Sequence, residues 1–221
     1  MELPQGFTFK WIMAELRRGV YGEYYGSPYN SSIGLTYAQM LVNATYIYKY
    51  LTNKGWTLNA IAGLLGNMQA ESSLNPGRWQ SEDVGNTSGG YGLVQWTPAT
   101  KYFDYCTAHG LSDPSEMDNN LLRIIYELEN GLQWIATDEY NLTFEEFSKS
   151  QQPVEYLASA FLKNYERAGV EVEDQRRVNA VEWLAFLTDS DIDVNPPSVK
   201  PTKKNRKRFN FIIFNRQRRY F

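Results

Sequence analysis

The helical spacing of apolar residues between positions 36 and 188 most strongly constrains what this chain can fold into. Apolar side chains recur every three or four residues in separate segments, a period typical of amphipathic helices. Thr36 and Thr57 are suited to cap the first two segments, and Thr143 with Glu146 has the spacing of a capping box. We therefore predict about seven helices around one small β element. Five of the predicted helices begin near Thr36, Thr57, Thr97–Pro98, Asp113–Pro114 and Thr143, and two more carry the apolar residues within 154–165 and 178–185.

Two segments carry weaker structural signals. Leu93–Trp96 is the single convincing strand piece, and it follows a stretch from Ser81 to Gly92 that is rich in Gly, Ser, Asn and Asp, as in a long loop or short hairpin. Residues 1–35 lack sustained periodicity, and we interpret them as an extended arm with one short helix near Lys10–Arg18. The predicted fold class is mainly α (α+β), a helical domain with one small β-hairpin.

Composition and charge divide the chain into four parts. We predict an N-terminal arm at 1–35, a globular domain at 36–188, an Asp- and Pro-rich linker at 189–202 and a basic, aromatic tail at 203–221. Residues 200–221 carry nine Lys or Arg and no acidic residue, whereas the remainder has a net charge of −12. An acidic body would repel DNA, so nucleic acid ranks last among the partners. We expect the tail to dock to another protein.

Several function classes are disfavoured by what the chain contains. One Cys and one His cannot supply the three or four ligands of a zinc site, so no metal or other cofactor is expected. Cys106 and His109 lie three positions apart, but we interpret Cys106 as a small buried hydrophobe rather than a nucleophile. No apolar run approaches the roughly 18 residues of a membrane span. Residues 1–10 have no basic region followed by an apolar core, so we expect synthesis in the cytoplasm without a signal peptide.

Glu71 is the first candidate for a chemical role. On a helix it falls within about 20° of Leu64 and about 60° of Met68, so its carboxyl emerges on the apolar side, where the protonated form is favoured. Cleavage of a glycosidic bond needs such a proton donor and a second carboxylate or a positioned water. Glu82 and Asp83 are the nearest candidates for the second carboxylate. We prefer Asp83, whose polar surroundings keep it ionised, and interpret Glu82 as a solvated loop residue.

Three separated motifs carry a resemblance to a known family. Glu71–Ser72, followed by Gly-Leu-Val-Gln-Trp-Thr-Pro at 92–98, resembles the Glu-Ser…Gly-Leu-x-Gln pattern of lysozyme-like glycosidases and lytic transglycosylases. The longer run from 55 to 77, together with 85–88, is similar to the phage tail lysozymes of small short-tailed phages. The segment Phe-Leu-Lys-Asn-Tyr-Glu-Arg at 161–167 matches the late helical motif of that family. The resemblance covers about residues 36–188.

The resemblance implies a lysozyme-like fold, location in the phage tail and cleavage of peptidoglycan glycan strands during genome delivery. It makes Glu71 the catalytic acid, and it places Gln95 and Tyr165 along the sugar cleft. Trp96 belongs either to the cleft or to the core. Other tail proteins are the expected partners of the arm and the basic tail. A metallopeptidase domain, which some relatives carry after the linker, is not expected with a single histidine.

Three alternatives remain open at this point. Muramidase hydrolysis is favoured by Asp83, whereas a lytic transglycosylase needs only one carboxyl and an intramolecular hydroxyl attack. A non-catalytic tail-tip or wall-binding protein would keep the same fold without using Glu71.

Overall fold

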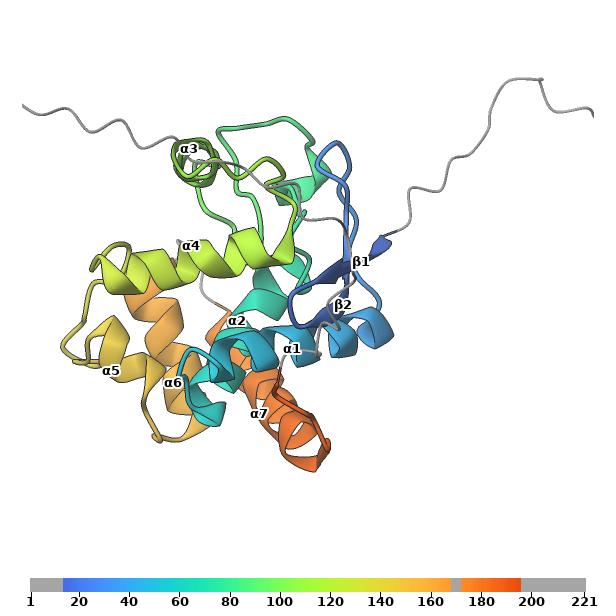
Figure 1. The fold of residues 1–221 in the computed structure, drawn as a ribbon. Coiled ribbons are helices and arrows are strands. Elements are labelled where there is room, and N and C mark those ends of the chain that lie inside the picture. The colour runs from blue at the N-terminus through green and yellow to red at the C-terminus, as the bar shows by residue number, and fades with distance from the viewer. Residues whose placement is uncertain (1–13, 168–171, 196–221) are drawn as a thin grey trace, which may run out of the picture.

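The chain is mainly helical, with one two-stranded antiparallel sheet, as the computed structural model of residues 14–167 and 172–195 shows (Figure 1). The sheet pairs β1 with β2, and the remaining elements are α-helices, a 3₁₀ turn (η1) and a π-helical turn (η2). The elements are β1 Glu15–Gly19, β2 Gly22–Gly26, α1 Tyr37–Thr52, α2 Leu58–Ser72, η1 Gln80–Glu82, α3 Thr100–Ala108, α4 Met117–Glu129, α5 Phe144–Ser148, α6 Val154–Phe161, η2 Leu162–Glu166 and α7 Glu173–Asp189.

Helix α2 is the centre of the fold. Every residue from Ala60 to Met68 is buried, which is typical of a helix covered on all sides rather than of a surface helix. Helices α1, α6 and α7 pack against it, and the hairpin lies at the opposite end of the molecule from α5 and α6 (Figure 1). The core therefore surrounds α2 up to Met68, and Glu71 lies in the helical turn that follows directly.

Two glycines let the neighbouring helices approach α2 closely. A Cβ atom at Gly63 would lie 3.0 Å from the Cβ of Leu157 on α6. At Gly66 it would lie 2.5 Å from the carbonyl oxygen of Arg176 and 2.8 Å from the Cβ of Ala180, both on α7. The absence of a side chain at Gly66 thus sets how near the Arg176 turn of α7 can come to the end of α2.

The predicted caps of three helices are confirmed. Thr36 and Thr143 each form a complete capping box, and the Thr57 hydroxyl accepts a hydrogen bond from the Ala60 amide. Two predicted starts are wrong, because the capping side chains are engaged elsewhere. Thr97 donates to the Gln95 carbonyl, and α3 begins at Thr100.

The second wrong start is at Asp113. This carboxylate accepts hydrogen bonds from the amide and the hydroxyl of Ser115, which makes a local turn, and α4 begins at Met117.

The β structure lies where the sequence did not predict it. Residues 15–18 belong to strand β1 and not to a helix, since Leu16 and Arg17 pair with Tyr25 and Tyr24 across the hairpin. Residues 93–95 form turns rather than a strand, because Gly92 and Gln95 both have positive φ (83° and 49°). The β contribution there is limited to two isolated bridges, which join Tyr91 to Trp79 and to Trp96.

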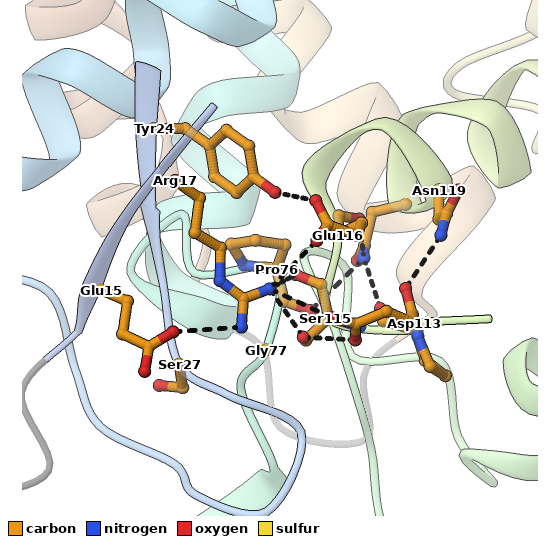
Figure 2. Close-up of polar contacts among 12 residues, drawn as sticks. Glu15, Arg17, Tyr24, Ser27, Pro76, Gly77, Asp113, Ser115, Glu116 and Asn119 are labelled. Carbon is orange, nitrogen blue, oxygen red and sulfur yellow. Dashed lines mark hydrogen bonds and ion pairs between the residues drawn. The ribbon is translucent and has the colours of Figure 1, made fainter. Parts of the chain in front are cut away.

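The hairpin is tied to the start of α4 by a polar network, shown in Figure 2. Arg17 donates to the hydroxyl of Ser115 at 2.8 Å and lies 3.5 Å from a carboxylate oxygen of Asp113, while the Tyr24 hydroxyl donates to Glu116. Tyr24 is fully buried, and burial together with the Glu116 carboxylate raises its pKa, so it stays a neutral donor. The described part of the predicted arm therefore packs on the helical body.

Three predictions concern the ends of the chain, where the structure does not describe every residue. The arm before residue 14, the linker beyond 195 and the tail at 203–221 lie outside the described residues. Within residues 14–167 and 172–195, no helix is long and apolar enough to cross a membrane. The same residues contain no group of three His, Cys, Asp or Glu side chains that is placed to hold a metal ion.

Candidate active site

A cleft of about 640 Å³ opens beside the end of α2. One part of its lining comes from residues 78–81 at the start of η1, from the turn at 94–97 and from the start of α3. The other part comes from the end of α2, the loop after α4 and the end of η2. Its lining residues are Glu71, Arg78, Trp79, Gln80, Ser81, Val94, Gln95, Trp96, Thr97, Lys101, Gln133, Tyr165, Glu166 and Arg167. This volume is in the range of ligand-binding pockets.

Glu71 lies in the last turn of α2, which ends at Ser72 and is followed by Ser73 in the left-handed conformation. The Ser72 hydroxyl donates to the carbonyl oxygens of Met68 and Leu93, which joins the helix end to the cleft loop. The Glu71 side chain is 18% exposed and forms an ion pair of 2.6 Å with Arg176 on α7. The sequence predicted the apolar surroundings but not this arginine, which gives the carboxylate a buried cationic partner.

Arg176 is itself buried and donates a second hydrogen bond, at 3.1 Å, to the side-chain oxygen of Asn67. One guanidinium therefore contacts two successive turns of α2, at Asn67 and at Glu71. The contact depends on the close approach of α7 at Gly66, which lies one position before Asn67.

Glu166 is a second carboxyl in the cleft, and sequence analysis did not single it out. It ends η2, a π-helical turn that continues α6. Its Oε1 atom is buried and accepts no hydrogen bond from any residue that the structure describes. Burial, reinforced by the negative charge of Glu71, raises the pKa of Glu166 well above its ordinary value, despite opposing contributions from Arg176 and Arg167.

Trp96 and Tyr165 form the aromatic floor of the cleft, held together by a buried carboxylate. The Trp96 indole donates at 3.1 Å to Glu127, the Tyr165 hydroxyl donates to the same carboxylate, and Arg123 pairs with it at 2.8 Å. Trp96 and Tyr165 are 3% and 1% exposed, so each offers the cleft only a small part of its ring. The indole of Trp96 stacks on Tyr102, with ring centroids 4.6 Å apart, which makes it mainly a core residue.

The remaining predicted site residues divide between the cleft and the surface. Gln95 lines the cleft, and its amide donates to the carbonyls of Arg78 and Gly92, so it also shapes the loop. Asp83 does not line the cleft. It is exposed and accepts a hydrogen bond from Asn86 within the same loop. Glu82 is exposed and lies 3.3 Å from Arg78, as expected for a solvated loop residue.

Cys106 is buried, and burial raises the pKa of its thiol. Its assignment as a buried hydrophobe is confirmed. The exposed ring of His109 lies against Tyr105, with its Nδ1 atom 2.9 Å from the Tyr105 carbonyl oxygen.

Comparison with known proteins agrees with the geometry of this site. The family described as phage tail lysozyme matches residues 42–187, which include α2, the cleft loops and η2. The chain belongs to the phage tail lysozyme family. Membership confirms the family resemblance seen in the sequence.

A relative of this chain is "Morphogenesis protein 1" of Bacillus phage B103. The two are 48% identical over 160 residues, which is 72% of this chain and 43% of the relative. The chain thus spans less than half the length of that relative.

Proposed function

We propose that the chain is a glycosidase of the phage tail that hydrolyses glycan strands of peptidoglycan as the genome is delivered. The observation that supports this most directly is the presence of two carboxyls, Glu71 and Glu166, in one cleft with an aromatic floor. Most glycosidases use a pair of carboxyls to cleave the glycosidic bond. Membership of the phage tail lysozyme family supports peptidoglycan as the class of substrate.

Glu71 is a catalytic carboxyl in this proposal. The sequence predicts that it donates the proton, and the ion pair with Arg176 holds its carboxyl in place at the end of α2. Cleavage is therefore expected to depend on it. Gln95 and the exposed edges of Trp96 and Tyr165 are the proposed contacts for the sugar, because all three line the same cleft.

The experiment is digestion of purified peptidoglycan by the wild type and by Glu71→Gln. Loss of a general acid or of its partner reduces turnover by about 10²–10⁴-fold, so a loss of that order is expected in a variant that remains folded. Glu182→Gln is the matched control, since Glu182 is exposed on α7 and does not line the cleft. Wild-type protein that releases no glycan fragments would refute the proposal.

The products of the same digestion distinguish hydrolysis from lytic transglycosylation. Hydrolysis leaves reducing ends, and we expect these by mass spectrometry. Anhydro-sugar ends would instead show intramolecular attack by a substrate hydroxyl, and the enzyme would then be a lytic transglycosylase.

A second candidate function is favoured by the name of the relative, which refers to morphogenesis. In this case the domain serves virion assembly and not wall cleavage. Phage carrying Glu71→Gln would decide between the two. The glycosidase proposal expects complete particles that digest peptidoglycan poorly, whereas a purely structural role expects both properties to be unchanged.

A further inference from the structure

Two cations line the part of the cleft that is formed by residues 78–81, the turn at 94–97 and the start of α3. They are Arg78, which lies shortly before η1, and Lys101 in the first turn of α3. The two carboxyls, Glu71 and Glu166, belong to the other part of the lining. Cleavage of the glycosidic bond by carboxyls leaves these two cations without a role.

The Arg78 guanidinium is poorly satisfied by the protein. Its Nη1 atom is buried and donates no hydrogen bond to any residue that the structure describes. Glu82 lies 3.3 Å from Nη1, but the Glu82 side chain is 62% exposed, and exposed ion pairs contribute little. The Arg78 side chain is itself only 21% exposed. An unbonded donor in such a place costs free energy, which an acceptor on a bound ligand would recover.

The backbone holds Arg78 in place. Its carbonyl oxygen accepts from the Gly92 amide at 2.9 Å and from the Gln95 side chain at 3.1 Å. The next residue, Trp79, is fully buried, and its indole donates to the Tyr29 carbonyl at 2.8 Å. A charged group on a backbone fixed in this way is positioned before the ligand arrives.

The other cations of the cleft differ in how far the protein uses them. Arg167 donates to the carbonyl oxygens of Gln133 and Asn164, so part of its guanidinium is engaged. Lys101 is exposed, and its ammonium group has no ion pair within the described part of the chain. Residues 1–199 have a net charge of −12, which would repel an acidic polymer. Arg78 and Lys101 counteract that repulsion where the substrate enters the cleft.

We propose that Arg78, assisted by Lys101, binds a carboxylate of the peptidoglycan strand and makes the cleft selective for anionic glycans. This inference rests on the proposed glycosidase function and adds a specificity-determining residue to the same site. Two sources supply the carboxylate. Stem peptides carry free carboxylates, and the lactyl group of muramic acid is a carboxylate wherever the stem is absent. A planar guanidinium binds either one with two parallel hydrogen bonds.

The test uses soluble peptidoglycan oligomers, untreated or coupled to ammonia with a carbodiimide, which converts carboxylates into neutral amides. We expect amidation to raise the KM of the wild type by roughly 10–100-fold, with a smaller change in kcat. Arg78→Gln should show a rise of that order on the untreated oligomers, and amidation should then add little. Lys101→Gln should raise KM by a smaller factor.

Arg18→Gln is the matched control. Arg18 is an exposed arginine that pairs with Glu23 on the hairpin and does not line the cleft, so this variant should behave as the wild type does. Oligomers whose stem peptides have been removed by an amidase distinguish the two sources. If KM still depends on Arg78 with these oligomers, the lactyl carboxylate is the ligand, and if the dependence disappears, the ligand is a stem carboxylate.

Equal KM values of the wild type on untreated and amidated oligomers would overturn the proposal and leave the glycosidase function standing. This comparison does not require any variant to fold. An equal rise on amidation in the wild type and in Arg78→Gln would also overturn it, because another group would then bind the carboxylate. A wild type that cleaves neither kind of oligomer would instead refute the proposed function itself.

Discussion

At the scale of single residues, the site depends on a charge pair that crosses from α7 to α2. Arg176 is 6% exposed and has two partners, Glu71 and Asn67. A buried ion pair contributes little net stability relative to apolar groups, but removal of one partner leaves an uncompensated charge. Arg176 is thus important mainly as the charged partner that positions the Glu71 carboxylate.

The first prediction tests this pairing. Arg176→Met should lower the free energy of unfolding by on the order of 2 kcal/mol, less than the roughly 3–5 kcal/mol of a fully buried pair. The expected loss is smaller than for a fully buried pair because the Glu71 side chain is 18% exposed. Chemical denaturation measures the free energy of unfolding. The double variant Arg176→Met/Glu71→Gln should regain part of the loss, because no unpaired charge remains. Strictly additive losses would show that the two residues are not coupled.

At the scale of elements, the geometry of the site depends on how closely α7 packs on α2. Gly66 is the contact point, and an added Cβ there would meet backbone atoms of α7 rather than a flexible side chain. A backbone clash is relieved only if the helix moves. That movement would carry Arg176 away from Glu71.

We therefore predict that Gly66→Ala lowers the unfolding free energy by about 1–3 kcal/mol, even though alanine favours the helix by roughly 1 kcal/mol. Gly63→Ala is the control, because its nearest contact is 3.0 Å rather than 2.5 Å, and it should be less destabilising. Peptidoglycan cleavage should fall further in Gly66→Ala than in Gly63→Ala at temperatures where both are folded. Equal effects on activity would contradict the role given to the α2–α7 contact.

The elements also show how far sequence could predict the structure. Helix periodicity and caps are local properties, so α1, α2 and α5 were predicted with their caps at Thr36, Thr57 and Thr143. The hairpin at 15–26 was missed, because its register depends on Tyr24 and Arg17 finding partners near α4.

At the site, the sequence identified Glu71, because the helical periodicity of its own segment places it on the apolar side of the helix. It could not find Arg176, which lies 105 positions further along the chain. Glu166 was within the late motif at 161–167, directly after Tyr165, and that adjacency is the signal that could have identified it.

At the scale of the whole molecule, charge is distributed unevenly. The body up to residue 199 has a net charge of −12, and residues 200–221 have +9. Opposite charges of this size favour docking to an acidic partner surface, and the effect weakens as salt screens it. The apolar centre at 209–214 is rich in residues that favour strands, which are suited to pairing with the edge of a sheet. We propose that the tail docks to another virion protein.

Deletion of residues 196–221 is the final prediction. All the residues that line the cleft lie before residue 168, so turnover on soluble glycan fragments should be unchanged. Incorporation into phage particles should fall, as measured by quantitative mass spectrometry of purified virions.

A control variant with Lys203, Lys204, Arg206, Lys207 and Arg208 changed to Gln keeps the apolar centre and removes five charges. A smaller defect in this control would assign part of the docking to the apolar centre. A large loss of turnover in the deleted protein, with normal incorporation, would show that the tail serves catalysis and not docking.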